Sequence, residues 1–468
     1  MKLSKIAHLL GTDDNNIPEV DIHWLLTDSR SLSFPSGTLF FALKTSRNDG
    51  HRYIAELYRQ NLRYFVVSEM LPDFETLTDA VFIHMDDTLQ ALQTLAAAHR
   101  AEFSIPVIGI TGSNGKTVVK EWLYQMLHTD FRIVRSPRSY NSQIGVPLSV
   151  WSLSDSSELA IFEAGISRTG EMQKLQPIIR PTIGIFTNLG DAHQEGFTGL
   201  KQKCDEKMKL FIDSEVLIYN SDNKLVDISI AQAGLKARLF SWGKKADTTV
   251  QVLKTEKTET GTILYLKYQE KKFELNINFS DDASIENAMQ CICTMLYLNY
   301  KSVEINKRLL NLETVAMRLE VKEGNHDCLL INDTYNSDLN SLSIALSFLN
   351  QQSTKKNLSR TLILSDILQS GHSSEELYEL VARLVQSKNI HRMIGVGEVI
   401  SSYADRFQTE EKYFFRTTDD LLKSPLMREF SKEIILLKGS RSFHFEDILA
   451  KLELIVHETT LDVDLNAL

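Results

Sequence analysis

The stretch IPVIGITGSNGKTVVKEWLYQML, residues 105–127, decides the fold of the chain around it. Its first residues are apolar and rich in Val and Ile, which is typical of a buried strand, and its last ten carry apolar side chains at helical spacing. A strand, a glycine turn, a Lys-Thr pair and a helix in this order predict a phosphate-binding loop. The loop residues are Thr111, Gly112, Ser113, Asn114, Gly115, Lys116 and Thr117.

The chemistry of such a loop follows from its donors. Backbone N–H groups and the positive end of the helix face a polyphosphate, Lys116 neutralises charge, and the Thr117 hydroxyl can ligate magnesium. The commonest form spaces its glycines GxxxxGK, whereas Ile110 stands here at the first glycine position. The alternative is a strand-to-helix turn whose lysine is only solvated. The surrounding strand and helix and the hydroxyl residues favour phosphate binding.

Composition limits the class of protein. A chain of 468 residues suggests roughly three domains. The net charge of −10 argues against nucleic acid as a main partner, and no apolar stretch is long enough to insert into a membrane. The N-terminus meets acidic residues too early for a secretory signal, so we expect a cytoplasmic protein. The four cysteines lack CxxC spacing, and Cys291 with Cys293 is more typical of helix packing than of a metal site.

Strand-like and helical runs alternate along most of the chain, which predicts an α/β protein with ligands at the carboxyl ends of its strands. We expect a small α/β N-terminal domain, a central doubly wound, mostly parallel sheet that carries the phosphate-binding loop and a β-meander near 249–279, and a Rossmann-like C-terminal α/β domain. The expected bounds are 1–102, 103–313 and 314–456, followed by a segment at 457–468.

Polar residues follow several of the expected strands. Glu163 ends a strand at 159–163, and Asn188 ends the next at 183–188. In the first hundred residues, polar side chains cluster at 28–30 and 47–51 around the strand expected at 37–44. Ligand binding and ordinary turn chemistry both explain that cluster, and the residues alone leave the choice open.

Seven motifs occur in an order that resembles the Mur ligase family over nearly the whole chain. They are TGSNGKT at 111–117, the strand end at Glu163, NLGDAHQEGF at 188–197, Asn287, Arg318, DTYN at 333–336 and LKGSR at 437–441. The family consists of ATP-dependent amide-forming enzymes of peptidoglycan precursor synthesis. The resemblance therefore implies that ATP converts a carboxylate to an acyl phosphate, which an amine then attacks.

Within the family, the chain is most similar to members that add D-alanyl-D-alanine to UDP-N-acetylmuramoyl-tripeptide. The supporting stretches are DSRSLSFPSGTLFFALK, RNDGH, NSQIGVPLSV, AHQEGF and LKGSRSFHFEDIL. The DNPR signature of the enzyme that adds the third peptide residue is absent. Alternatives are another ligase of this type, a folylpolyglutamate synthetase, or an inactive nucleotide-binding scaffold.

The resemblance implies catalytic roles for Lys116, Glu163, His193 and Lys207, and two magnesium ions held by Thr117, Glu163, His193 and Lys207. Lys207 matches a lysine that the family carbamylates. Carbon dioxide adds only to a neutral amine, so the pKa of this lysine, ordinarily ~10.4, must be lowered locally. A packed or surface histidine, a helix-terminal charge at Glu163 and a solvated Lys207 are the structural alternatives.

The resemblance also implies nucleotide and substrate contacts. Nucleotide contacts beyond the loop fall on Asn287, Arg318, Asp333, Tyr335 and Asn336. Substrate contacts fall on Ser29, Arg30, Lys44, Arg47, Asp49 and Asn141 for the UDP-sugar acceptor and on Lys438, Ser440 and Arg441 for the incoming dipeptide. A structural salt bridge is the alternative for Arg441. Ala283 and Ser284 depart from the family's usual His-Asn, which puts the base contacts in doubt.

The last residues, HETTLDVDLNAL, alternate apolar and polar side chains as a strand does. They resemble the opening strand of alanine racemases, which would make this chain the ligase half of a ligase–racemase fusion. An ordinary terminal tail is the alternative.

Overall fold

The computed structural model describes residues 1–12, 17–46, 48–190, 196–258, 261–335, 337–368, 370 and 372–454. Arg47, His193, Asn336 and the racemase-like segment 457–468 lie outside the described residues. Contacts divide the chain into two compact units. The first comprises Met1–Gly190, Gly196–Ser280 and Ser284–Leu312, and the second the described residues from Glu313 on together with Asp281–Ala283.

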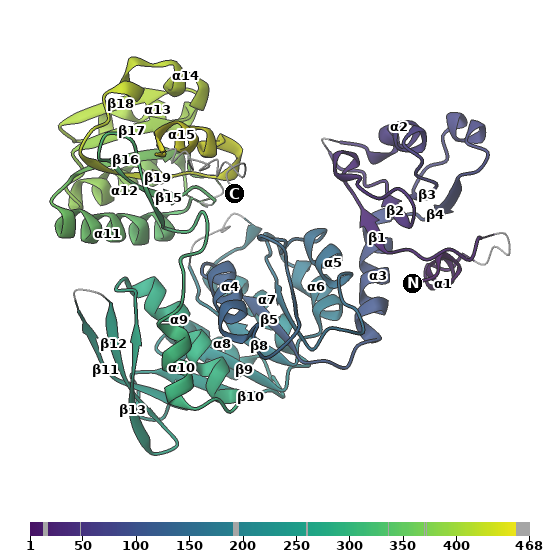
Figure 1. The fold of residues 1–468 in the computed structure, drawn as a ribbon, viewed down its shortest axis with the longest axis horizontal. Coiled ribbons are helices and arrows are strands. Elements are labelled where there is room, and N and C mark those ends of the chain that lie inside the picture. The colour runs from purple at the N-terminus through teal and green to yellow at the C-terminus, as the bar shows by residue number, and fades with distance from the viewer. Residues whose placement is uncertain are drawn as a thin grey trace, which may run out of the picture. The chain divides into compact units, whose positions relative to one another are not determined.

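The first unit begins with a four-stranded parallel sheet in the order β1-β2-β3-β4. Its strands are β1 (Trp24–Leu26), β2 (Thr38–Phe41), β3 (Tyr64–Val67) and β4 (Val81–His84), and its helices are α1 (Leu3–Leu9), α2 (Ile54–Arg59) and α3 (Thr88–Ala101). Every side chain of β2 is buried because apolar helices and loops cover both faces of the sheet. Figure 1 shows these elements in purple.

The centre of the first unit is a nine-stranded sheet in the order β13-β12-β11-β10-β9-β8-β5-β7-β6. The strands are β5 (Val107–Thr111), β6 (Ile133–Arg135), β7 (Leu159–Glu163), β8 (Ile183–Phe186), β9 (Val216–Asn220), β10 (Arg238–Gly243), β11 (Val250–Lys257), β12 (Thr262–Tyr268) and β13 (Lys271–Ile277). Pairing is parallel from β6 to β11 and antiparallel through the β11–β12–β13 meander.

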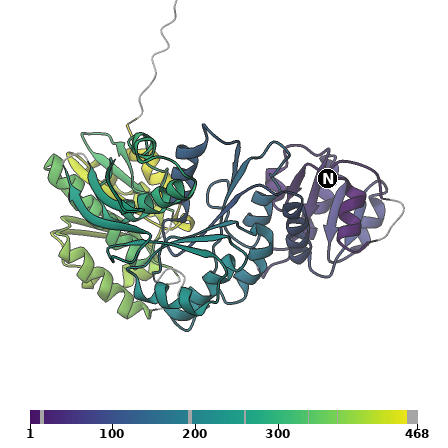
Figure 2. The same ribbon diagram turned by 90° about the horizontal axis from the view of Figure 1, so that it is seen from below.

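Helices lie on both sides of this sheet (Figures 1 and 2). Residues of α5 (Gly145–Val150), α6 (Glu171–Ile179), α7 (Leu200–Met208) and α8 (Lys224–Gln232) share one apolar cluster with α3 and the sheet. The remaining helices are α4 (Lys116–Leu127), α9 (Asp282–Tyr297) and α10 (Ser302–Leu309). The Trp122 ring of α4 is 2% exposed and stacks on Phe279, so the apolar stripe that the sequence places on α4 is its buried face.

The second unit is a six-stranded sheet in the order β14-β15-β19-β16-β17-β18, parallel except for β14. Its strands are β14 (Glu320–Glu323), β15 (Leu329–Asp333), β16 (Ser359–Ser365), β17 (Arg392–Val396), β18 (Glu411–Phe415) and β19 (Glu433–Lys438). Its helices are α11 (Leu339–Lys356), α12 (Ser374–Ser387), α13 (Glu398–Ser402), α14 (Thr418–Lys423) and α15 (Phe445–Leu452). Two apolar clusters, one on each face, form its core.

The predicted fold class is confirmed: an α/β chain with three sheets, a doubly wound central sheet and a meander at its edge. The sequence missed β1, which has only three residues and pairs with β2 ahead of the strand expected to come first. Cys291 and Cys293 are free, fully buried thiols in α9, which confirms helix packing. Within the described residues, no helix is long and apolar enough to cross a membrane.

Candidate active site

The turn between β5 and α4 has a backbone that only glycine adopts readily. Gly115 is the N-cap of α4 with φ +82°, and Gly112 has φ +146°. A Cβ on Gly115 would lie 2.2 Å from Asn287 Oδ1, and one on Gly112 would lie 2.0 Å from Thr187 Oγ1. Both glycines are therefore required by conformation and by close approach of neighbouring side chains.

The end of β8 fastens this turn from the other side. Asn188 Oδ1 accepts a hydrogen bond from the Asn114 N–H at 2.9 Å, and the Ser113 N–H donates to Asn188 O at 2.9 Å. The Thr187 hydroxyl donates to Asn114 O at 2.6 Å. These bonds hold the loop in one shape, so its remaining N–H groups are preorganised for an anion at the start of α4.

Two lysines converge on one carbonyl of the loop. Lys116 Nζ donates to Gly112 O at 2.9 Å, and Lys207 Nζ of α7 donates to the same oxygen at 3.0 Å. Lys207 is 2% exposed, and Lys203 is also buried nearby. Burial, together with the positive charges of Lys116 and Lys203, holds the pKa of Lys207 well below its ordinary value. Burial of Lys207 rules out the solvated-lysine alternative.

A buried carboxylate faces the loop from the end of β7. Glu163 is fully buried, and its Oε2 accepts a hydrogen bond from the Thr117 hydroxyl at 3.0 Å and one from Asn141 Nδ2 at 3.4 Å. The Ser139 hydroxyl lies 3.0 Å from Thr117 Oγ1. The structure thus brings a loop hydroxyl, a strand-end carboxylate and a predicted substrate-binding amide into one cluster.

The counter-charge of Glu163 is a lysine that the sequence did not single out. Lys120, on the first turns of α4, is fully buried, and its Nζ lies 3.0 Å from Glu163 Oε1. This contact is an ion pair without the alignment of a hydrogen bond, and Glu163 Oε1 has no hydrogen-bond partner among the described residues. Lys120 Nζ also lies 3.0 Å from Glu121 Oε1.

Strand order explains why these groups meet. β5 pairs with β7 on one side and with β8 on the other. After β5 the chain continues on the side of β6 and β7 and then crosses to the side of β8 and β9, so the strand order reverses at β5. The carboxyl ends of these three strands carry the loop, Glu163 and Asn188. A point where strand order reverses is where open α/β sheets bind ligands.

The residues at this edge fit a magnesium ion. Magnesium prefers hard oxygen ligands and takes few of them from protein when phosphates supply the rest. Thr117 and Glu163 offer a hydroxyl and a buried carboxylate 3.0 Å apart, and one oxygen of that carboxylate has no hydrogen bond. The described residues hold no group of three or more His, Cys, Asp or Glu side chains suited to a metal.

The second unit has its own polar cluster at the carboxyl ends of β15 and β19. Lys438 Nζ lies 2.8 Å from Asp333 Oδ2, and both side chains are largely buried. The Arg318 guanidinium stacks over the Tyr335 ring at 4.0 Å. Four predicted residues therefore pair with one another here. Arg441 is exposed and makes no ion pair with a described residue, so the salt-bridge alternative is not observed.

Most of the residues of the first sheet that are predicted to bind the UDP-sugar substrate form ion pairs or hydrogen bonds with neighbouring side chains. Arg30 donates to Asp28 at 2.7 Å, and Lys44 pairs with Glu69 at 2.5 Å. Asp49 accepts from His51 Nδ1 at 2.6 Å, while His51 Nε2 accepts the N–H of Ser68 at 3.0 Å. A cavity of about 420 Å³ is lined by Thr27, Asp28, Ser29, Arg30, Leu43, Thr45, Asn48, Gly50, Tyr53 and Ile144.

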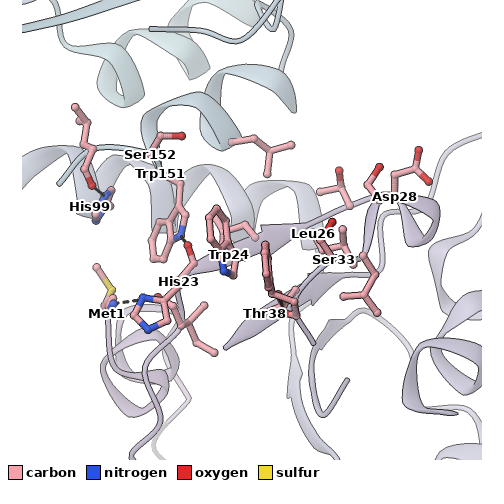
Figure 3. A pocket seen from close by; sticks show the side chains of 18 of the residues that line it. Met1, His23, Trp24, Leu26, Asp28, Ser33, Thr38, His99, Trp151 and Ser152 are labelled. Atoms are coloured by element: carbon pink, nitrogen blue, oxygen red, sulfur yellow. Dashed lines mark hydrogen bonds between the residues drawn. The ribbon is translucent and has the colours of Figure 1, made fainter. Parts of the chain in front are cut away.

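A larger cavity of about 1040 Å³ adjoins Asp28 (Figure 3). Trp24, 52% exposed, stacks on Phe34 at 5.6 Å between ring centroids, and both rings line it. Trp151 also lines the cavity and donates from Nε1 to His23 O at 3.0 Å. Sequence patterns gave no sign of this hollow because its residues come from segments more than a hundred positions apart.

The chain is similar to known proteins over most of its length. Residues 110–295 match the model of the Mur ligase middle domain. A UDP-N-acetylmuramoyl-tripeptide–D-alanyl-D-alanine ligase of Synechocystis sp. is 30% identical over 73% of this chain and 72% of its own. The ligase of the same name from Bacillus subtilis is 27% identical over 92% and 93%. The crystal structure of MurF ligase from Thermotoga maritima in complex with ADP has a TM-score of 0.74 at 22% identity, covering 92% and 96%.

Fold and site together define an ATP-dependent ligase built around a phosphate-binding loop. The chain belongs to the Mur ligase family.

Proposed function

We propose that this chain uses ATP to join D-alanyl-D-alanine to UDP-N-acetylmuramoyl-tripeptide. These two substrates are the ones that the names of its relatives state for those proteins. The observation that carries the proposal is the cluster of Thr117, Glu163 and the two lysines on Gly112 O. A carboxylate and an amine do not condense spontaneously in water, so a site that stabilises a transferring phosphoryl group is what the reaction needs.

The residues of the loop divide the work. The N–H groups at the start of α4 bind phosphate oxygens. Lys116 Nζ, which donates to Gly112 O and Ser113 O, would turn from these carbonyls to the γ-phosphate. Thr117 and Glu163 would hold magnesium, which supplies positive charge to the phosphoryl group when bound. His193 belongs to the proposed set by resemblance and lies outside the described residues. A carboxylate oxygen of the acceptor attacks the γ-phosphorus of ATP, and ADP leaves. The amine of the dipeptide then attacks the acyl carbon, phosphate leaves, and the nitrogen loses a proton.

Carbamylation of Lys207 is part of the proposal. The lowered pKa leaves more of the amine neutral at pH 7, which is the form that attacks carbon dioxide and then releases a proton. The product is an anion between Lys116 and Lys203. These two ammonium groups, which repel a protonated Lys207, attract its carbamate. This gain favours the modification at Lys207 over any exposed lysine of α7.

Carbon-13 NMR tests the modification directly. Protein equilibrated with ¹³C-bicarbonate should show one protected carbamate resonance that Lys207→Arg removes. Lys209→Arg is the matched control because Lys209 lies on the same helical segment, is half exposed and pairs with Glu206. A resonance that survives Lys207→Arg would assign the carbamate elsewhere.

The other proposed contacts follow the division of the chain. The first sheet, with Ser29 and Arg30 at its 420 Å³ cavity, would take the UDP-sugar end of the acceptor. Asn141, beside Glu163, would meet the acceptor's carboxylate. The second unit, with Lys438, Ser440 and Arg441, would take the dipeptide. The four free cysteines are in keeping with a reducing cytoplasm.

A substrate-pair screen tests the proposal. Purified chain with ATP, magnesium, tripeptide precursor and D-alanyl-D-alanine should release phosphate and form the pentapeptide product. Glu163→Gln, which keeps the shape and removes the charge, should lower kcat by about 10²-fold or more. Release that requires a free amino acid instead of the dipeptide would identify a different ligase, and background release with every pair would identify a non-catalytic nucleotide-binding protein.

A further inference from the structure

The ion pair between Lys120 and Glu163 has no role in the proposed phosphoryl transfer, although it is the most deeply buried charge pair at the site. Both side chains are fully buried. An ion pair is rarely retained in such a position for stability, because desolvation offsets most of the attraction. The position of this pair next to Thr117 calls for an explanation in terms of the site.

Lys120 is held by more than one carboxylate. Its Nζ donates to Ser136 O at 2.7 Å and to Arg138 O, in addition to its contacts with Glu163 and Glu121. Two carbonyls and two carboxylates thus fix the position of the ammonium. The same ammonium therefore fixes the side chain of Glu163 with Oε2 toward Thr117.

The charges of the cluster cancel. Glu163 and Glu121 contribute two negative charges, while Lys120 and Arg135, which lies 3.0 Å from Glu121 Oε2, contribute two positive ones. A divalent cation that approached Glu163 alone would meet a neutral cluster with Lys120 already paired to the carboxylate. A cation that arrives with a nucleotide brings its own phosphate charge and does not meet this obstacle.

We infer that Lys120 is an internal counter-ion, which neutralises Glu163 and fixes its side chain when no metal is bound. The divalent ion therefore enters this site only together with a nucleotide. The inference rests on the proposed metal role of Thr117 and Glu163. Lys120 is a positioning residue: it is fully buried and acts through Glu163. The consequence is that the site does not trap magnesium in the absence of ATP.

Binding of Mn²⁺ without nucleotide tests the inference, by titration of the full chain and loss of the free-ion EPR signal. The natural chain should bind Mn²⁺ weakly, and Lys120→Gln, which keeps a donor for the carbonyls but lacks the charge, should bind it about tenfold more tightly or better. Magnesium should also raise the unfolding temperature of Lys120→Gln and leave that of the natural chain unchanged. Glu121→Gln is the matched control, because it removes the other carboxylate charge beside the Lys120 ammonium and keeps the ion pair between Lys120 and Glu163.

Several results would overturn the inference. They are tight Mn²⁺ binding by the natural chain, no gain in Lys120→Gln, or an equal gain in Glu121→Gln. If Lys120→Gln does not fold, Lys120→Met is the second variant. Folding of either only in millimolar magnesium supports the inference, and failure of both with magnesium present counts against it. Failure of the proposed function is distinguishable: the natural chain would then bind no Mn²⁺ with ATP present, or Glu163→Gln would bind it equally well.

Discussion

Gly115 offers the sharpest test of the loop because the chain contains a matched glycine. Gly115 caps α4 with φ +82° and ψ −15°, and Gly170 caps α6 with φ +85° and ψ −13°. A Cβ on Gly170 meets nothing within 4 Å, whereas one on Gly115 lies 2.2 Å from Asn287 Oδ1. Alanine at either position suffers the same backbone strain, and only at Gly115 does it also collide.

The magnitudes follow from these two terms. An L-residue in the left-handed region costs about 1–2 kcal/mol. Alanine also lowers the conformational entropy of the unfolded chain, which offsets part of this cost, so Gly170→Ala should lose about 1 kcal/mol of stability. Overpacking adds about 1–3 kcal/mol at Gly115, because Asn287 is itself 8% exposed and must move. Gly115→Ala should therefore lose about 3 kcal/mol. The difference of about 2 kcal/mol is roughly a 30-fold change in a local opening constant.

Amide hydrogen exchange of the helix after each glycine measures the effect locally, which suits a chain of several domains. Protection in α4 should fall about 30-fold further in Gly115→Ala than protection in α6 falls in Gly170→Ala. Adding Asn287→Ala to Gly115→Ala should recover most of that excess. Equal losses in the two glycine variants, or no recovery in the double variant, would show that the approach of Asn287 does not constrain the loop.

Three further predictions concern buried or paired charges. Lys207→Met should abolish ligase activity yet raise the unfolding temperature at pH 7 in carbon-dioxide-free buffer. Because the pKa of Lys207 is lowered in the folded state, this lysine destabilises the fold at neutral pH, and the destabilisation vanishes as pH rises toward 10.5. The unfolding temperatures of the variant and the natural chain should therefore converge there. Arg308 holds the pKa of Asp130 below its ordinary value, so the stability that this pair contributes should be complete above the unfolded pKa of 3.8 and be lost as pH falls through the lower folded value, a dependence that unfolding curves between acid and neutral pH should show and Asp130→Asn should flatten. Lys438→Met should destabilise the second unit by about 3–5 kcal/mol in urea unfolding, because Asp333 is left as an uncompensated buried charge, and Asp333→Asn in the same chain should recover part of the loss; an additive double variant would contradict the pairing.

The phosphate-binding loop was predictable because every feature it needs is local. Glycines at Gly112 and Gly115, a strand before them, and a Lys-Thr pair and a helix after them lie within one short stretch, and this order of features predicts the anion site. The alternation of strands and helices along the chain was predictable for a similar reason, since the periodicity of each segment indicates whether it forms a strand or a helix. Short strands such as β1 escaped because three residues carry no period.

The amino-acid sequence by itself determined the α/β class, the position of the loop and the order of the motifs, since each is written in neighbouring residues. Only the tertiary structure decided which charges meet. Lys120 is 43 positions from Glu163, and Lys207 is 95 from Gly112; pattern alone would leave both lysines on solvated helix faces. They are buried because β5 lies between β7 and β8, and that strand order is fixed by long-range packing, not by any single segment.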